Sequence, residues 1–156
     1  MKTASRHGTG LFVLVRTSNP GAGLLQDQVF GNKTVYQTVA DWVETWSRDS
    51  AGSFTYGPVG AVVGATVPAQ VVELRQRMPH VLLLLPGYGA QGGTSADIAT
   101  AFDPDGLGAV VNNSRGILFA YRNPKYVGLR FDQASRKATQ EMIDDLARNT
   151  PAGALR

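Results

Sequence analysis

The sequence predicts an α/β fold built from four consecutive βα units. Short apolar runs rich in β-branched residues alternate with stretches of helical periodicity, and glycine-rich turns separate them. The 156 residues are enough for one domain of ordinary size and too few for two. The strand-like runs are apolar almost throughout, which is typical of parallel strands that are buried on both faces.

The first unit begins with a strand over residues 10–16, GLFVLVR. After a turn at Asn19-Pro20-Gly21, Thr34 provides a cap for a helix that we expect to end near Ser50. Apolar residues recur in it at helical spacing, and we expect the two tryptophans to pack in the core rather than to stack on bases. These apolar residues are Val35, Val39, Trp42, Val43 and Trp46.

The second unit combines a strand over residues 58–66 with a helix that Pro68 opens. Glu73 and Arg77 are about one helical turn apart, so we expect them to pair on the outside of that helix. Four apolar residues are expected to face the core: Val71, Val72, Leu74 and Met78.

The third strand, residues 81–85, runs directly into a glycine-rich loop over residues 86–93. Thr94 or Ser95 can then cap a short helix that ends near Phe102.

The fourth strand, residues 108–113, leads into Ser114-Arg115-Gly116 and a brief apolar turn over residues 117–121. We expect residues 123–131 to be a flexible insertion before the last helix, which begins near Asp132. One face of that helix carries Ala134, Ala138, Met142 and Leu146.

Four such units fit two architectures, a small doubly wound sheet or half of an eight-stranded (β/α) barrel. A complete barrel typically needs about 250 residues and rarely fewer than about 200, so it does not fit in this chain. In both architectures the functional loops follow the carboxyl ends of the strands. Here these loops come after Arg16, Thr66, Leu85 and Asn113.

Composition excludes several classes of function. The chain has no cysteine, which excludes disulfides, thiolate-bound metals and a cysteine nucleophile. The net charge is +3, but the cations are dispersed, so we expect no binding to nucleic acid. The longest apolar run, residues 81–86, is far shorter than the ~20 residues of a membrane span. We find no secretion signal and expect a soluble, cytoplasmic protein.

The two histidines, His7 and His80, lie away from the strand ends. We therefore expect neither to act as an acid or a metal ligand, and we predict no metal site.

The loops after the third and fourth strands are candidates for anion binding. Four glycines among residues 86–93 let the backbone approach a ligand closely, and Arg115 follows Ser114 at the start of a short helix. The alternative is that the glycines only permit tight turns and that Arg115 is a solvated surface cation.

The loop after the first strand carries Ser18 and Asn19, whose side chains can donate and accept hydrogen bonds to a polar ring. The alternative is an ordinary turn, for which Ser, Asn, Pro and Gly are the usual residues. Thr66, after the second strand, can be a ligand contact or simply a helix cap.

Four motifs in this order resemble orotidine 5′-phosphate decarboxylase, in particular its longer bacterial and archaeal-type subfamily. They are FVLVRTSNPGA over residues 12–22, VVGAT over 62–66, LPGYGAQGG over 85–93 and NSRGI over 113–117.

The resemblance implies a homodimeric (β/α)8 TIM barrel of the ribulose-phosphate-binding type. It converts orotidine 5′-monophosphate (OMP) to uridine 5′-monophosphate (UMP) and carbon dioxide in pyrimidine biosynthesis, without metal or organic cofactor. Residues 1–156 look like a single domain, the carboxyl-terminal half of that barrel, with the amino-terminal half absent.

The resemblance also implies roles for individual residues. Ser18 would hydrogen-bond the pyrimidine, Gln91 would bridge the phosphate and a ring carbonyl, and Arg115, with the amides of Ser114 and Arg115, would hold the phosphate. Residues 86–93 would close over the nucleotide. The implied substrate-binding set is Ser18, Asn19, Pro86, Gly89, Gln91, Gly92, Gly93, Ser114 and Arg115.

The chain departs from the family in its catalytic motif. The family's Asp-x-Lys-x-x-Asp pattern does not occur here, since Lys2, Lys33, Lys125 and Lys137 all stand in unrelated contexts. Without this proton donor we expect no useful decarboxylation by the chain alone. Tyr88, at a position often aliphatic in the family, and Asn19, which other branches replace with His, do not change the assignment.

Two hypotheses remain open, an enzyme half that needs a separate amino-terminal half, and a non-catalytic nucleotide-binding half-barrel. Exposed edges of a half sheet favour aggregation, so we expect self-association or a complementing partner in either case. A third hypothesis, another phosphate-binding barrel enzyme, gives no reason for the RTSNPG motif over residues 16–21.

Overall fold

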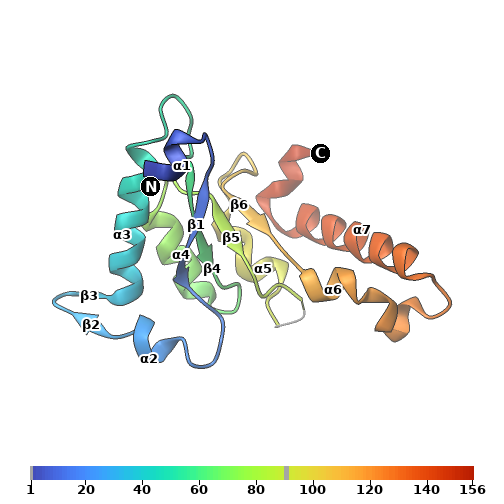
Figure 1. The fold of residues 1–156 in the computed structure, drawn as a ribbon. Coiled ribbons are helices and arrows are strands. Elements are labelled where there is room, and N and C mark those ends of the chain that lie inside the picture. Colours follow the sequence, from blue (N-terminus) through green and yellow to red (C-terminus); the bar gives the residue numbers. More distant parts are fainter. Residues whose placement is uncertain (1, 90–91) are drawn as a thin grey trace.

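A computed structural model describes residues 2–89 and 92–156 (Figure 1). In this part of the chain a main sheet of four parallel strands has the order β1-β4-β5-β6. Each strand lies within a predicted one and is shorter than expected, because the backbone pairing ends before the apolar run does. The strands are β1 (Leu11–Arg16), β4 (Val59–Val63), β5 (Leu83–Leu85) and β6 (Ala109–Val111).

Helices follow the strands of the main sheet, as predicted. A small antiparallel pair, β2 (Val29–Phe30) and β3 (Lys33–Thr34), lies between the first strand and the first long helix and was not expected. In the described residues no helix combines the length and apolar character needed to cross a membrane. The α-helices are α1 (Lys2–Arg6), α2 (Gly23–Gln26), α3 (Val35–Arg48), α4 (Pro68–Arg77), α5 (Ser95–Ile98), α6 (Ser114–Leu118) and α7 (Phe131–Asn149). Short 3₁₀ helices are η1 (Ala99–Ala101), η2 (Ala120–Arg122), η3 (Pro124–Tyr126) and η4 (Pro151–Leu155).

Local signals set the starts of the helices. The hydroxyl of Thr34 accepts a hydrogen bond from the amide of Gln37 at 3.3 Å, and the Gln37 side chain accepts one from the Thr34 amide at 2.8 Å. This reciprocal capping box confirms the predicted start of α3. Pro68 opens α4 as predicted, but Thr66 does not cap it, because the N-cap residue is Val67 and no side chain caps this helix. Thr94 caps α5.

Two predictions about core residues are wrong. Trp42 and Trp46 are exposed on the surface of α3, and Val72 is exposed on α4. In α3 a neighbouring stripe faces the sheet instead, so the helix is rotated from the predicted orientation. That stripe consists of Tyr36, Ala40, Val43 and Ser47.

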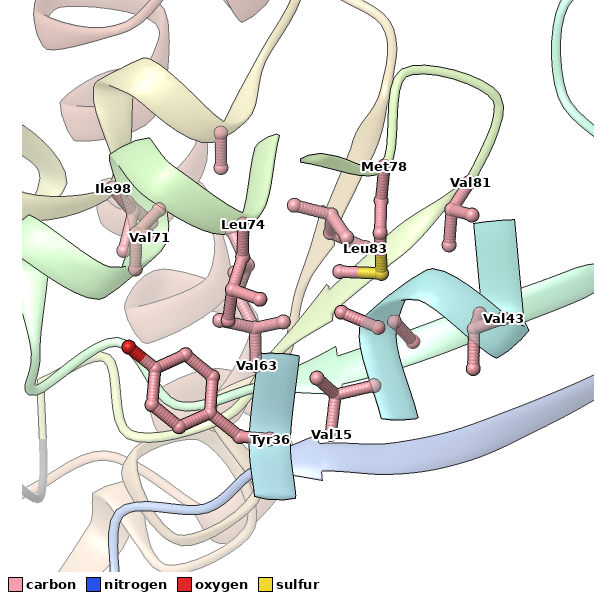
Figure 2. Close-up of a cluster of buried hydrophobic side chains, with 14 of the residues drawn as sticks. Val15, Tyr36, Val43, Val63, Val71, Leu74, Met78, Val81, Leu83 and Ile98 are labelled. Atoms are coloured by element: carbon pink, nitrogen blue, oxygen red, sulfur yellow. The ribbon is translucent and has the colours of Figure 1, made fainter. Parts of the chain in front are cut away.

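The hydrophobic core lies on one face of the sheet, between the strands and helices α3 and α4 (Figure 2). The other face, which we call the open face, is apolar but not buried in this chain. Phe12, Leu14 and Val110 are 47%, 65% and 47% exposed there. The expectation that the strands are buried on both faces is therefore wrong for the described residues, because no second layer covers this face.

A register shift between Leu14 and Arg16 interrupts the alternation of side chains in β1. As a result Val15 and Arg16 are both buried, although they are consecutive in the strand. Arg16 lies over the ring of Tyr36, which belongs to α3, so its side chain turns to the helix-covered face.

Residues 123–131, expected to be a flexible insertion, contain η3 and are tied to the last helix. Tyr126 is buried, and its hydroxyl donates a hydrogen bond to Glu141 at 2.7 Å. The predicted apolar face of α7 is confirmed, since Ala134 and Met142 are buried and Ala138 and Leu146 pack against the two cores.

Candidate functional site

Two cavities share Pro86 at the carboxyl ends of the parallel strands. The β6 cavity has a volume of about 110 Å³, and the β1 cavity about 440 Å³. The β6 cavity is lined by Pro86, Gly87, Tyr88, Asn112, Asn113, Ser114 and Arg115. The β1 cavity is lined by Leu14, Thr17, Ser18, Asn19, Pro20, Val62 and Pro86.

Arg115 is the cation of the β6 cavity. Its side chain is exposed, and the structure records no hydrogen bond or ion pair between it and any other described residue. A guanidinium presents five N–H donors in a planar fork that suits the oxygens of a phosphate. Asn113 starts the helix that carries Arg115, since its Oδ1 accepts a hydrogen bond from the Gly116 amide at 3.1 Å.

Asn112 is a residue of this cavity that the sequence analysis missed. Its Oδ1 atom is buried and has no hydrogen-bond partner among the residues that the structure describes. A buried acceptor without a partner costs free energy, and a donor on a ligand in the cavity would supply one. Its position at the end of an apolar run, just before Ser114, was the available signal.

The glycine-rich loop turns back on itself. The amides of Gly89, Gly92 and Gly93 donate to carbonyl groups within the loop, at 2.8, 2.9 and 3.1 Å. Gly89 has a φ of +69°, which a residue with a side chain rarely adopts. In this conformation the three amides are engaged inside the loop, so the glycines shape its turns.

Tyr88 fastens this loop to the last helix. Its hydroxyl donates a hydrogen bond to Oδ2 of Asp145 at 2.7 Å. Burial, together with the nearby carboxylate, raises the pKa of Tyr88 well above its usual value, and the hydrogen bond lowers the pKa of Asp145. A third, polar cavity of about 570 Å³ lies between the loop and α7, with Gly89, Asn113 and Arg148 in its wall.

Ser18 and Asn19 line the β1 cavity. Asn19 Oδ1 accepts a hydrogen bond from the Thr17 hydroxyl at 2.5 Å, which holds the turn. Ser18 packs closely on β4, where a Cβ at Gly64 would come within 3.0 Å of the Ser18 side chain. A residue as small as glycine at position 64 therefore allows this loop to lie against the sheet.

Arg16 supports the same loop from beneath, a role that the sequence analysis missed. It donates to Gln70 at 2.7 Å and to Gln26 at 2.9 Å, and pairs with Asp27 at 3.2 Å. Gln26 Oε1 also accepts from the Thr17 amide at 3.1 Å. The loop with Ser18 and Asn19 is thus tied to α2 and α4 through one buried guanidinium.

The structure brings most of the predicted residues to one edge of the sheet, but not into one cavity. Ser18 and Asn19 lie in the β1 cavity and Ser114 and Arg115 in the β6 cavity, with Pro86 common to both. Three residues lie elsewhere. Gly89 lines the third cavity, and Gly92 and Gly93 belong to the turns of the loop, while Gln91 lies outside the described residues.

Ion pairs engage two of the lysines away from these cavities. Lys33 pairs with Asp41 at 2.7 Å, and Lys125 pairs with Glu141 at 2.6 Å. The part of the chain that the structure describes contains no group of three or more His, Asp or Glu residues arranged to hold a metal ion.

Comparison with known proteins gives a consistent result. Residues 1–131 match the model of the orotidine 5′-phosphate decarboxylase / HUMPS family. The chain is 47% identical over 150 residues to orotidine 5′-phosphate decarboxylase of Rhodopirellula baltica, covering 94% of this chain and 50% of the relative. It is 40% identical over 138 residues to that of Clostridium acetobutylicum, covering 88% and 48%.

The fold agrees with these matches. OMP decarboxylase of Leishmania donovani superimposes with a TM-score of 0.69 at 30% identity, over 90% of this chain and 48% of that protein. The chain thus spans about half the length of the relatives it matches, and its four-stranded parallel sheet aligns with about half of their TIM barrel. With a family match over most of its length, the chain belongs to the orotidine 5′-phosphate decarboxylase / HUMPS family.

Proposed function

We propose that this chain is the carboxyl-terminal half of an orotidine 5′-phosphate decarboxylase, and that it binds the phosphate and the pyrimidine of OMP and UMP. The observation that carries the proposal is the pair of cavities that share Pro86. One contains an unpaired cation, and the other contains a hydroxyl and a carboxamide. A nucleotide needs both kinds of partner, at neighbouring places.

In this proposal the phosphate binds in the β6 cavity. Arg115 donates to its oxygens, and the Ser114 hydroxyl lies beside it. The unpartnered Oδ1 of Asn112 marks a place for a hydroxyl donor of the ribose or of the phosphate monoanion. Pro86 then separates the phosphate from the base.

The pyrimidine binds in the β1 cavity. Ser18 and Asn19 can donate to and accept from the alternating carbonyl and N–H groups of its ring edge. Leu14 and Val62 supply an apolar wall for the ring. Binding energy from the phosphate and ring edge would hold the substrate for a reaction at a different part of the ring.

The proton donor for decarboxylation comes, in this proposal, from a separate amino-terminal half. The sequence has no Asp-x-Lys-x-x-Asp motif, and Lys33 and Lys125 are engaged with Asp41 and Glu141. We expect the chain to bind nucleotide without converting OMP, and to need no metal or organic cofactor.

Calorimetric titration with UMP tests the binding. The wild-type chain should bind, and Arg115→Ala should lose at least tenfold in affinity, because one charge-assisted contact contributes about 1.5–3 kcal/mol. Arg136→Ala, which removes an exposed arginine from α7, should leave the affinity unchanged. A folded wild-type chain that takes up no UMP would refute the proposal.

The absent catalytic motif favours a second candidate, a nucleotide-binding half-barrel with no catalytic role. Mixing the chain with the amino-terminal half of a relative distinguishes the two. Decarboxylation of OMP, followed by its change in ultraviolet absorbance, supports the enzyme half. Nucleotide binding without turnover in a well-formed mixed complex supports the second candidate.

A further inference from the structure

The open face of the sheet is a continuous apolar surface. The strand residues Phe12 and Leu14 of β1 and Val110 of β6 are exposed there, and Val62 and Leu84 between them are half-buried. Isolated exposed apolar residues need no explanation, but a row of them across a whole sheet marks an interaction surface.

The two edges of the same sheet are also unpaired. β1 pairs only with β4, and β6 only with β5, among the residues that the structure describes (Figure 1). Such edges expose backbone N–H and C=O groups that will pair with another strand. Because all four strands are parallel, a partner must present parallel strands that run in the same direction.

We propose that the occupant of this surface is a second copy of this chain, and that two copies close into one eight-stranded parallel barrel. A twofold axis along the strands places β1 of each copy beside β6 of the other, with the strand directions matched. The single operation covers both open faces and pairs all four edges, so the assembly stops at two copies.

Size and charge agree with this occupant. The relatives are about twice as long as this chain, which aligns with half of their barrel, so a second copy supplies the missing number of strands. An interior of eight strands is just wide enough to be filled by side chains. Phe12, Leu14 and Val110 would fill it, and they bring no like charges together.

Closure would also complete the β1 cavity. Leu14 and Val62 of the open face line that cavity together with Ser18 and Asn19. The second copy would therefore cover its apolar wall. The proposal itself rests on the sheet and its edges, so it stands or falls independently of nucleotide binding.

Disulfide crosslinking gives a direct test, because the chain has no cysteine of its own. Within one copy β1 and β6 are three strand spacings apart, about 14 Å, whereas the Cα atoms of a disulfide lie within about 7 Å. A bond between the two edges must therefore join two copies. Two variants cover the possible registers, Leu14→Cys with Val110→Cys, and Phe12→Cys with Val110→Cys.

Under mild oxidation we expect at least one of these variants to form a dimer held by two disulfides, seen on a non-reducing gel and by mass spectrometry. Phe30→Cys with Val127→Cys is the control, since both positions are exposed and lie outside the main sheet. It should give no covalent dimer. Equal crosslinking in the control, or none in either edge variant, would overturn the proposal.

Light scattering gives an independent readout. The wild-type chain should have the mass of two copies, and Leu14→Glu, which places a charge on the open face, should reduce it to one. Leu25→Glu, at an exposed residue of α2, should leave the dimer intact, with circular dichroism confirming that both variants fold. A single-copy wild-type mass, a mass that grows beyond two copies with concentration, or a dimer insensitive to Leu14→Glu would each overturn the proposal. A single copy that combines with a relative's amino-terminal half would identify that half as the occupant instead.

Discussion

The hydroxyl of Tyr88 and the carboxylate of Asp145 lie 2.7 Å apart and join two segments that are 57 residues apart in the sequence. Tyr88 stands in the glycine-rich loop, and Asp145 in the middle of α7. The loop beside the β6 cavity is therefore held by a helix that contributes no strand-end residue. Substitution at this contact should reveal how far the loop depends on α7.

Tyr88→Phe should loosen the loop without unfolding the protein. The lost hydrogen bond to a charged group predicts a destabilisation of about 1–2 kcal/mol in urea unfolding. Amide hydrogen exchange should become faster in residues 86–89. Tyr126→Phe removes a similar bond from Tyr126 to Glu141 outside the loop and should leave exchange in residues 86–89 unchanged. The same exchange pattern in both variants would show that the Tyr88 contact has no special effect on the loop.

The same contact should make stability depend on acid pH. The pKa of Asp145 is lowered in the folded chain, chiefly by the hydrogen bond from Tyr88. A lowered folded pKa stabilises the protein above the unfolded value, about 3.9, and this contribution disappears as the pH falls through the folded value. The difference in unfolding free energy between wild type and Tyr88→Phe should thus be constant from about pH 5 to 7 and shrink below about pH 4. A difference that stays constant down to about pH 2 would contradict this assignment.

Arg16→Met should destabilise the fold and disturb the β1 cavity. It leaves Gln26, Asp27 and Gln70 without their shared donor, which predicts a loss of about 2–4 kcal/mol in thermal or urea unfolding. Arg48→Met is the matched control, because its recorded ion pair with Asp49 is solvent-exposed, and it should change stability by less than about 0.5 kcal/mol. Equal effects of the two variants would show that the buried network contributes little.

Arg75→Leu should be at least as damaging. This guanidinium is buried, and it donates to the carbonyl groups of Gly108 at 3.0 Å and Val81 at 2.9 Å. It thereby connects α4 to the segments that lead into β5 and β6. Loss of these bonds leaves buried acceptors unpaired, and we expect destabilisation of about 3 kcal/mol or more in urea unfolding. A change below about 1 kcal/mol would mean that water replaces the guanidinium.

The elements that depend on local signals could be predicted from the sequence. Thr34 is followed three residues later by Gln37, and Pro68 stands at the first position of its helix, so both starts are fixed by adjacent residues. The parallel arrangement of the strands then implied that the loops after them share one edge. The placement of Ser18, Asn19, Ser114 and Arg115 at that edge followed from these two steps.

The features that depend on distant partners could not be predicted. Helical spacing makes Trp42 and Trp46 look like core residues, but which face of α3 meets the sheet is decided by tertiary packing. Likewise, arginine is normally exposed, and nothing near Arg75 in the sequence shows that Gly108 offers a carbonyl to it. Asn112 and the Tyr88–Asp145 contact were missed for the same reason.

The register shift in β1 determines where one full positive charge is placed. With strict alternation residue 16 would follow Phe12 and Leu14 onto the open face, and a guanidinium would stand in the interior of any barrel built on that face. The shift turns Arg16 toward Tyr36 and Gln70 instead, where polar partners are available. A single irregular residue thus separates two dielectric environments, a polar layer beneath the loops and a dry interior. Restoring regular alternation at this point would force an unpaired cation into that interior and oppose its closure.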